Sequence, residues 1–182
     1  MTVLVPGDPA SLSALGADLA RQGDLLREHR DDLLRVRESL RGWEGPAGYA
    51  FDGSLLAQLR AVEDAAEALT EGGRALQGYA VDLQHARALA GEAEEFLRAH
   101  GLLLHDDLRV GLPFGAYPVE EARAYEHHVP EGQRLVDRAV AERDEAARVL
   151  RLRSQGATAV LQQTAAVVAS AVQLAQGAVR RR

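Results

Sequence analysis

A short break between two long stretches of regularly spaced apolar residues is the feature that most constrains this chain. The break is Trp43-Glu44-Gly45-Pro46, and Trp43 is the only tryptophan among 182 residues. On each side, residues recur at alternating spacings of three and four, the pattern of a helix that packs lengthwise on another helix. The first seam comprises Leu12, Leu15, Leu19, Gln22, Leu26, His29, Leu33, Val36 and Leu40. The second comprises Leu55, Leu59, Val62, Ala66, Leu69, Gly73, Leu76, Ala80 and Leu83, and Ala86, Ala90, Ala93 and Leu97 extend it after a one-residue phase change. Two helices with so short a connection fold back antiparallel, so a helical hairpin is predicted over residues 1–100.

The residues of the break suit a sharp reversal of the chain. Gly42 and Gly45 permit the backbone angles that a reversal needs, and Pro46 fits the first turn of the next helix, where its missing N–H costs nothing. Trp43 can then lie across the open end of the hairpin, near Phe51. One interpretation is that Trp43 only closes the end of a helical bundle.

The same residues carry a second interpretation. Trp43, Gly45, the small Pro46-Ala47 start of the second helix and Phe51 together resemble the Trp-x-Gly (WXG) superfamily of type VII, or ESX, secretion systems in actinobacteria and firmicutes. The resemblance covers about residues 8 to 153. It implies a helical hairpin that is exported, either as a substrate or as the N-terminal targeting region of an effector. Whether a toxin domain follows residue 182 stays open.

The family resemblance also implies a tyrosine export signal, Tyr-x-x-x-Asp/Glu, after the hairpin. Tyr117 and Glu121 satisfy this spacing, although Pro118 lies between them. The alternative is that Tyr117 is a packed loop aromatic and that Glu120 and Glu121 favour the start of a helix through their charge.

The remainder of the chain predicts one more helical segment. Glycines and prolines recur from Gly101 to Pro118, so we expect a loop over 101–118. A third segment over 119–182 is expected to be kinked or interrupted at Pro130 and to cover the far half of the second helix. Aromatic residues make up only 4% of the sequence, which disfavours a sheet. The predicted fold is all-α: an elongated antiparallel helical hairpin with a long C-terminal helix packed alongside, like a bundle or coiled coil.

The stretch from Ser154 to Val179 carries no charge and approaches the length of a membrane span. Its many glutamine, serine and threonine residues make it too polar for that role. We expect a buried or partner-facing helix, with an amphipathic helix at a membrane surface as the alternative.

Composition argues against several classes of function. The net charge of −6 does not suit a nucleic-acid-binding protein, and the absence of cysteine excludes thiol chemistry. The histidine clusters, His100 with His105 and the pair His127-His128, lack the spacing of a metal site, so we expect them at solvated helix ends. No catalytic motif is present, and we predict a non-enzymatic protein without a cofactor or metal.

The sequence therefore favours a type VII secretion substrate or targeting domain that leaves the cell by a non-Sec route after a cytoplasmic phase. Every basic residue is arginine, a bias of high-GC genomes that fits an actinobacterium. The expected partners are the secretion ATPase and either a small WXG-like protein or a second copy, with no nucleic acid and no membrane span. The alternatives are a cytoplasmic helical adaptor or coiled-coil scaffold and a membrane-active helical protein. The seam residues predicted to contact a partner or the bundle are Leu26, His29, Leu33, Leu69 and Leu76.

Overall fold

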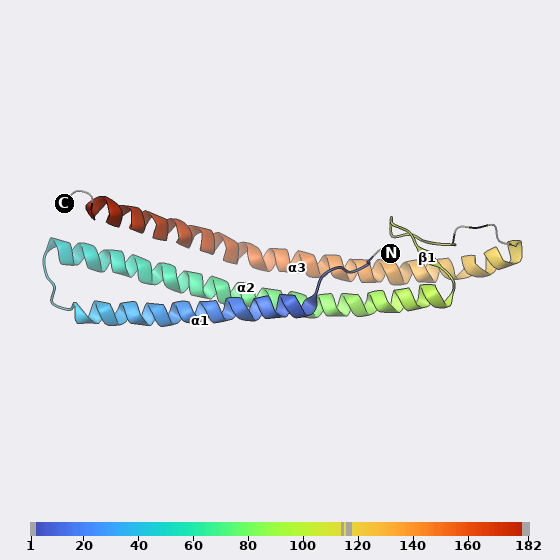
Figure 1. Cartoon of the computed structure of the whole chain (residues 1–182), viewed down its shortest axis with the longest axis horizontal. Helices are drawn as coiled ribbons and strands as arrows, with labels where there is room; N and C mark the ends of the chain where they lie inside the picture. The colour runs from blue at the N-terminus through green and yellow to red at the C-terminus, as the bar shows by residue number, and fades with distance from the viewer. Residues whose placement is uncertain (1–2, 114, 116–117, 180–182) are drawn as a thin grey trace. The chain divides into compact units, whose positions relative to one another are not determined.

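A computed structural model describes residues 3–113, 115 and 118–179, without the side chains of residues 119, 121 and 170–179. Its elements are α1 (Pro9–Ser39), α2 (Pro46–Ala99), β1 (Leu103–Leu104), β2 (Val110–Gly111) and α3 (Val119–Val179) (Figure 1). The predicted all-α class is confirmed, and one long helix lies on each side of the break at Trp43-Glu44-Gly45-Pro46.

The chain divides into two compact units. The first unit contains residues 1–12 and 78–150, and the second contains residues 13–77 and 151–182. Each long helix contributes one part to each unit.

In the second unit, α1 and the first half of α2 run antiparallel, as predicted (Figure 1). Their backbones come close because glycines face each other: a Cβ built on Gly16 would lie 2.6 Å from the carbonyl oxygen of Gly73. One built on Gly23 would lie 2.8 Å from the carbonyl oxygen of Ala66. Larger side chains at these positions would hold the two helices apart.

The positions of α1 that face α2 differ in part from the predicted seam. Gly16 and Gly23 are buried and Arg30 and Arg37 are half-buried, and these four positions repeat every seven residues. The predicted positions one residue earlier, Leu15, Gln22, His29 and Val36, are exposed. Four predicted positions hold, since Leu12, Leu19, Leu26 and Leu33 are half-buried, whereas Leu40 at the end of the seam is exposed. The helix is rotated from the predicted orientation because contact between glycines brings the backbones closer than leucine packing would.

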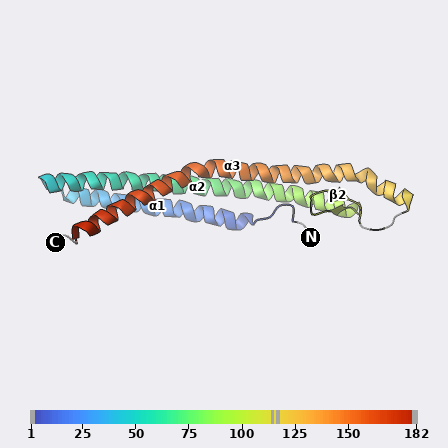
Figure 2. The ribbon, with the colours of Figure 1, turned by 90° about the horizontal axis from the view of Figure 1, so that it is seen from above.

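The first unit has a core of larger apolar side chains. Its most completely buried members are Leu4, Leu83 and Val136, which come from the N-terminal segment, α2 and α3. The full cluster consists of Leu4, Val5, Leu83, Ala86, Leu89, Ala90, Ala93, Leu97, Leu102, Val110, Val136 and Ala139. In this unit α3 covers the far half of α2, as predicted, and the two helices lie side by side in both views (Figures 1 and 2).

The N-terminal segment is an unpredicted part of this core. Leu4 and Val5 are buried, and arginines on two helices bind the segment's carbonyl groups. Arg143 donates a hydrogen bond to the oxygen of Leu4 at 3.0 Å, and Arg87 donates one to the oxygen of Gly7 at 3.1 Å. These bonds fix the segment that precedes α1.

Two further predictions are corrected in the first unit. The stretch 101–118, predicted as a loop, contains a small antiparallel hairpin in which Leu103 pairs with Gly111 and Leu104 with Val110. Of the interruption or kink predicted at Pro130, the interruption is wrong, because α3 runs through this residue. An internal proline removes one backbone hydrogen bond and crowds the preceding turn, which a long helix can accommodate without ending.

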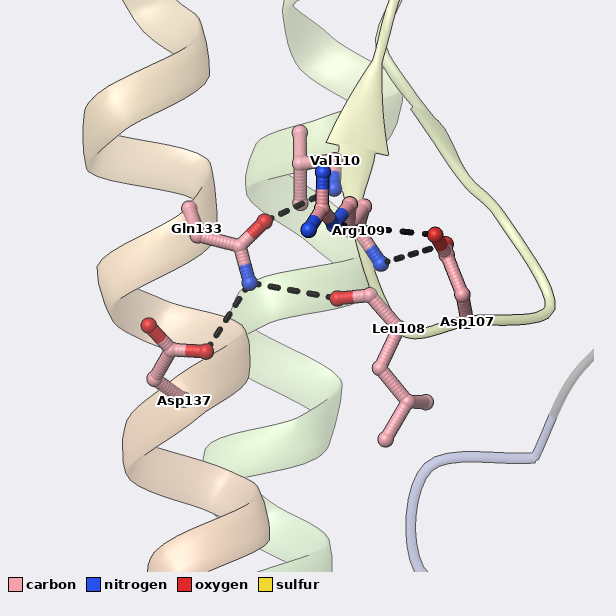
Figure 3. Close-up of polar contacts among 6 residues, drawn as sticks. All are labelled: Asp107, Leu108, Arg109, Val110, Gln133 and Asp137. Carbon is pink, nitrogen blue, oxygen red and sulfur yellow. Dashed lines mark hydrogen bonds and ion pairs between the residues drawn. The ribbon is translucent and has the colours of Figure 1, made fainter.

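Gln133 attaches the β1–β2 hairpin to α3 (Figure 3). Its side-chain oxygen accepts a hydrogen bond from the backbone N–H of Val110 at 2.8 Å. Its amide nitrogen donates to the backbone oxygen of Leu108 at 3.1 Å and to Asp137 Oδ1 at 2.9 Å. Leu108 has a left-handed backbone, with φ of 65°, at the turn of this hairpin. The Gln133 side chain therefore forms hydrogen bonds with backbone groups on both sides of Arg109, the oxygen of Leu108 and the N–H of Val110.

Candidate functional site at the Trp43 turn

The turn between α1 and α2 is closed by backbone hydrogen bonds and by glycine geometry. The N–H of Trp43 donates to the oxygen of Leu40 at 3.0 Å, and the N–H of Tyr49 donates to the oxygen of Gly45 at 3.0 Å. Gly42 and Gly45 both have φ of 100°, a region in which residues with a side chain are strained. Both glycines predicted to make the reversal thus adopt conformations that require glycine.

A third glycine belongs to this turn and was not predicted. A Cβ built on Gly48 would clash with the carbonyl oxygen of Trp43, so the backbone of Trp43 lies directly against the first turn of α2. The sequence feature that could have predicted this contact is the run Pro46-Ala47-Gly48, because three small residues at the start of a helix allow another backbone to approach. Trp43 is therefore placed by contact with α2 as well as by the turn itself.

The aromatic side chains of the turn remain largely accessible. Trp43 is 50% exposed and Tyr49 is 71% exposed. The rings of Trp43 and Phe51 lie 5.6 Å apart between centroids and are tilted by 48°. Leu55, one turn further along α2, is buried. Trp43 thus contacts Phe51 as predicted, but it does not close the end of the hairpin as a buried plug would.

A hollow of about 630 Å³ opens at this turn. Aromatic, aliphatic and charged side chains from both helices surround it. The residues that line it are Leu34, Arg37, Glu38, Leu40, Arg41, Gly42, Trp43, Glu44, Gly48, Tyr49, Phe51 and Asp52. A concave surface of mixed apolar and charged character is suited to binding a peptide segment or a protein surface.

The charged residues of this hollow are arranged in pairs. Arg37 Nε lies 2.6 Å from Asp52 Oδ1 and its Nη2 lies 3.2 Å from Oδ2, a bidentate pair between α1 and α2. The hydrogen bond from Arg37 lowers the pKa of Asp52, and the carboxylate in turn raises the pKa of Arg37. Glu38 and Arg41 pair at 3.2 Å along α1. The pair between helices fixes the orientation of α1 relative to α2 beside Trp43.

The other predicted site residues do not gather at this turn. Leu26, Leu33, Leu69 and Leu76 are half-buried, as expected for a seam within the bundle. His29 is exposed, so it does not pack within the bundle, and its predicted contact with a partner stays a prediction.

The tyrosine signal falls largely outside the part of the chain that can be described. Tyr117 lies outside the described residues, and Glu121 belongs to α3 with a side chain that is not described. The structure therefore does not test this signal.

Two other regions of the sequence suggested sites: the histidine clusters a metal site, and the uncharged stretch 154–179 a membrane span. Among the described residues, no group of three or more His, Cys, Asp or Glu side chains could hold a metal ion. Within the same residues, no helix is both long and apolar enough to cross a membrane. In the uncharged stretch Ala157 is buried while Val167 and Val168 are exposed, so its described part is mostly open to solvent.

No family model, curated protein or solved structure matches the chain.

Proposed function

We propose that this chain is a non-enzymatic substrate or export-targeting domain of a type VII secretion system, recognised through the Trp43 turn. The observation that carries the proposal is the partial exposure of Trp43 in a turn that depends on three glycines. Two of them adopt positive φ, and Gly48 admits the Trp43 backbone. The resemblance of Trp43, Gly45 and Phe51 to the WXG pattern is the reason for proposing a type VII secretion system as the machinery.

A purely structural role would favour a different arrangement. A tryptophan stabilises a fold mainly by burying its large apolar surface, and half of Trp43 remains in solvent. Tyr49 and Phe51 place further aromatic surface beside it. Aromatic and arginine side chains are enriched where proteins bind each other, and both types line this hollow. The turn therefore has the composition of a recognition surface.

The proposed partners follow from the same surface. A secretion ATPase would bind the aromatic turn, and a small WXG-like protein or a second copy would pack on the helices. In this proposal the chain is made in the cytoplasm and leaves by a non-Sec route to the cell surface or the medium.

One observation supports a second candidate, a cytoplasmic helical adaptor. Leu15, Gln22, His29 and Val36 recur every seven residues on an exposed face of α1, next to the exposed Leu25. Such a stripe can pack against a helix of another protein without any export.

The test is secretion of a tagged chain from an actinobacterial host with and without an active ESX ATPase. We compare wild type with Trp43→Ala, and with Val81→Ala as the control, because Val81 is 67% exposed and lies outside both the turn and the α1 stripe. Leu25→Ala is included as a change beside the stripe. Tyr117→Ala is included to test the tyrosine signal. All variants are compared at equal intracellular levels and equal helicity by circular dichroism.

Export that requires the ATPase, is lost with Trp43→Ala and is kept with Val81→Ala would support the proposal, and the Tyr117→Ala result would decide whether the tyrosine motif contributes. Export that survives Trp43→Ala would show that the secretion machinery does not recognise the chain through this turn. A wild-type chain that stays inside the cell under both conditions would favour the adaptor, and loss of a co-purifying partner in Leu25→Ala would then identify the α1 stripe as its binding face.

A further inference from the structure

Two histidines from different helices stack on each other in the first unit. His100 directly follows α2, and His128 lies in the third turn of α3. Their ring centroids are 3.9 Å apart with planes inclined by 24°. Phe96 lies 4.4 Å from the ring of His100 and 6.2 Å from that of His128, and His127 lies 5.4 Å from His128. Residues 28 positions apart in sequence thus form one ring cluster.

This cluster joins the end of α2 to the beginning of α3. The residue after His100, Gly101, has φ of 64°, and a Cβ built on it would lie 2.9 Å from Cε1 of Tyr125. Tyr125 and His128 are three residues apart, so they lie on the same face of α3. His100 and Gly101, which follow α2, therefore contact His128 and Tyr125 from adjacent turns of α3. The two stacked imidazoles are the polar part of this contact.

The stack suits neutral imidazoles and not charged ones. Two neutral rings can stack as aromatic groups do, whereas two imidazolium ions at this distance repel each other. Burial lowers the pKa of His128, and the charges that His100 and His127 carry when protonated lower that pKa further.

The other charged groups nearby do not offset this repulsion. Glu131, one turn along α3 from His128, forms an ion pair with Arg134. Glu126 is two residues from His128, and Arg98 is two residues from His100, spacings at which helical side chains do not face each other. In the β1–β2 hairpin, His105 lies against Gly111.

We propose that the His100–His128 stack is a pH-sensitive latch that holds the first turns of α3 against the end of α2 when both rings are neutral and releases them on acidification. This inference does not depend on the export proposal. A histidine with a lowered pKa in the folded state stabilises the fold above its unfolded pKa, near 6.5, and that stabilisation is lost as the pH falls through the folded value. The latch is therefore closed at neutral pH and opens in mildly acidic solution.

The test combines histidine NMR titration with hydrogen exchange on the full chain, in buffer with EDTA so that no metal occupies the rings. The wild type is compared with His100→Gln/His128→Gln, which cannot titrate, and with His128→Phe, which keeps a stacking ring without a charge. His85→Gln is the control, because His85 is exposed on α2 in the same unit. Exchange is followed at residues 96–104 and 122–129 between pH 7.5 and 5.0, as protection factors corrected for the pH dependence of intrinsic exchange.

We expect a several-fold loss of protection in both segments of wild type and of His85→Gln on acidification, together with titration of His128 below the ordinary histidine pKa. In His128→Phe the protection should stay high at both pH values, and in the double variant it should be low and independent of pH. Titration of His128 at or above the ordinary histidine pKa would overturn the proposal. Wild-type protection that does not change with pH, or the same pH dependence in the double variant, would overturn it as well.

Discussion

The two compact units use the same helices but differ in how they are packed. In the first unit, leucine and valine side chains from α2, α3 and the N-terminal segment fill a common core. In the second, the backbones of α1 and α2 approach each other at glycine and alanine, with half-buried leucines beside these contacts and ion pairs between the helices. Most of the exposed large apolar side chains among the described residues also lie in the second unit. The comparison indicates that the first unit provides a conventional core, while close backbone contact in the second leaves apolar side chains available at the surface.

The largest expected effect comes from truncating the core of the first unit. Leu83 is 1% exposed, so Leu83→Ala removes buried apolar contacts and should lower the free energy of unfolding by about 2–5 kcal/mol. Leu25→Ala, at a leucine that is 56% exposed in the second unit, should change it by no more than about 0.5 kcal/mol. Urea unfolding followed by circular dichroism measures both. Equal losses in the two variants would contradict the contrast between the units.

The glycine contact of the second unit provides a matched pair of adjacent residues. A Cβ on Gly73 would lie 2.5 Å from the backbone oxygen of Gly16, whereas one on Gly72 meets only the end of Leu19 at 4.0 Å. Gly73→Ala should therefore destabilise the protein by about 1–3 kcal/mol through overpacking. Gly72→Ala should stabilise it by about 1 kcal/mol through helix propensity. Thermal unfolding distinguishes the two, and a stabilised Gly73→Ala would show that the backbones do not touch.

A more local effect is expected where the β1–β2 hairpin joins α3. Gln133→Ala removes the acceptor of the Val110 N–H, which should cost about 1 kcal/mol for this partly buried bond. Amide exchange at Val110 should accelerate, while residues of the second unit exchange as before. Gln133→Glu serves as a control, because it keeps the acceptor but loses the donor to Leu108 and places a carboxylate near Asp137. Unchanged exchange at Val110 in Gln133→Ala would contradict the anchoring role.

Much of the fold was predictable from periodicity, and the failures have identifiable causes. The seam of α2 was predicted well because its buried positions are leucine and alanine, from Leu55 to Leu97. In α1, four seam positions were predicted one residue too early, at Leu15, Gln22, His29 and Val36. The cause is that a hydrophobic pattern gives no weight to the glycines that make the contact. Leu4 and Val5 were missed because their burial depends on side chains from distant parts of the chain, such as Arg143.

The candidate site was predictable in its residues and less so in its geometry. Trp43, Gly45 and Phe51 were singled out by their pattern, and the contact between Trp43 in the turn and Phe51 in α2 follows from the short connection. The exposure of Trp43 and the contact of Gly48 with its backbone depend on the angle at which α2 leaves the turn, which no residue pattern specifies. The His100–His128 stack was missed for a similar reason, since it depends on how α3 aligns with the end of α2.

The smallest expected effect sharpens the comparison at the Trp43 turn. Because the hydrogen bond from Arg37 lowers the pKa of Asp52, the pair stabilises the fold above the unfolded pKa of the carboxyl group, 3.8, and this contribution is lost as the pH falls through the folded value. Asp52→Asn should therefore unfold at a slightly lower temperature than wild type at pH 7, and the difference should shrink on acidification. Both side chains are partly exposed, so added salt should also reduce it. Asp107→Asn, in the β1–β2 turn, is the control for loss of a surface carboxylate beside an arginine in the first unit. A difference for Asp52→Asn that persists at acidic pH would show that packing in the hollow, and not the ion pair, holds α1 against α2 beside Trp43.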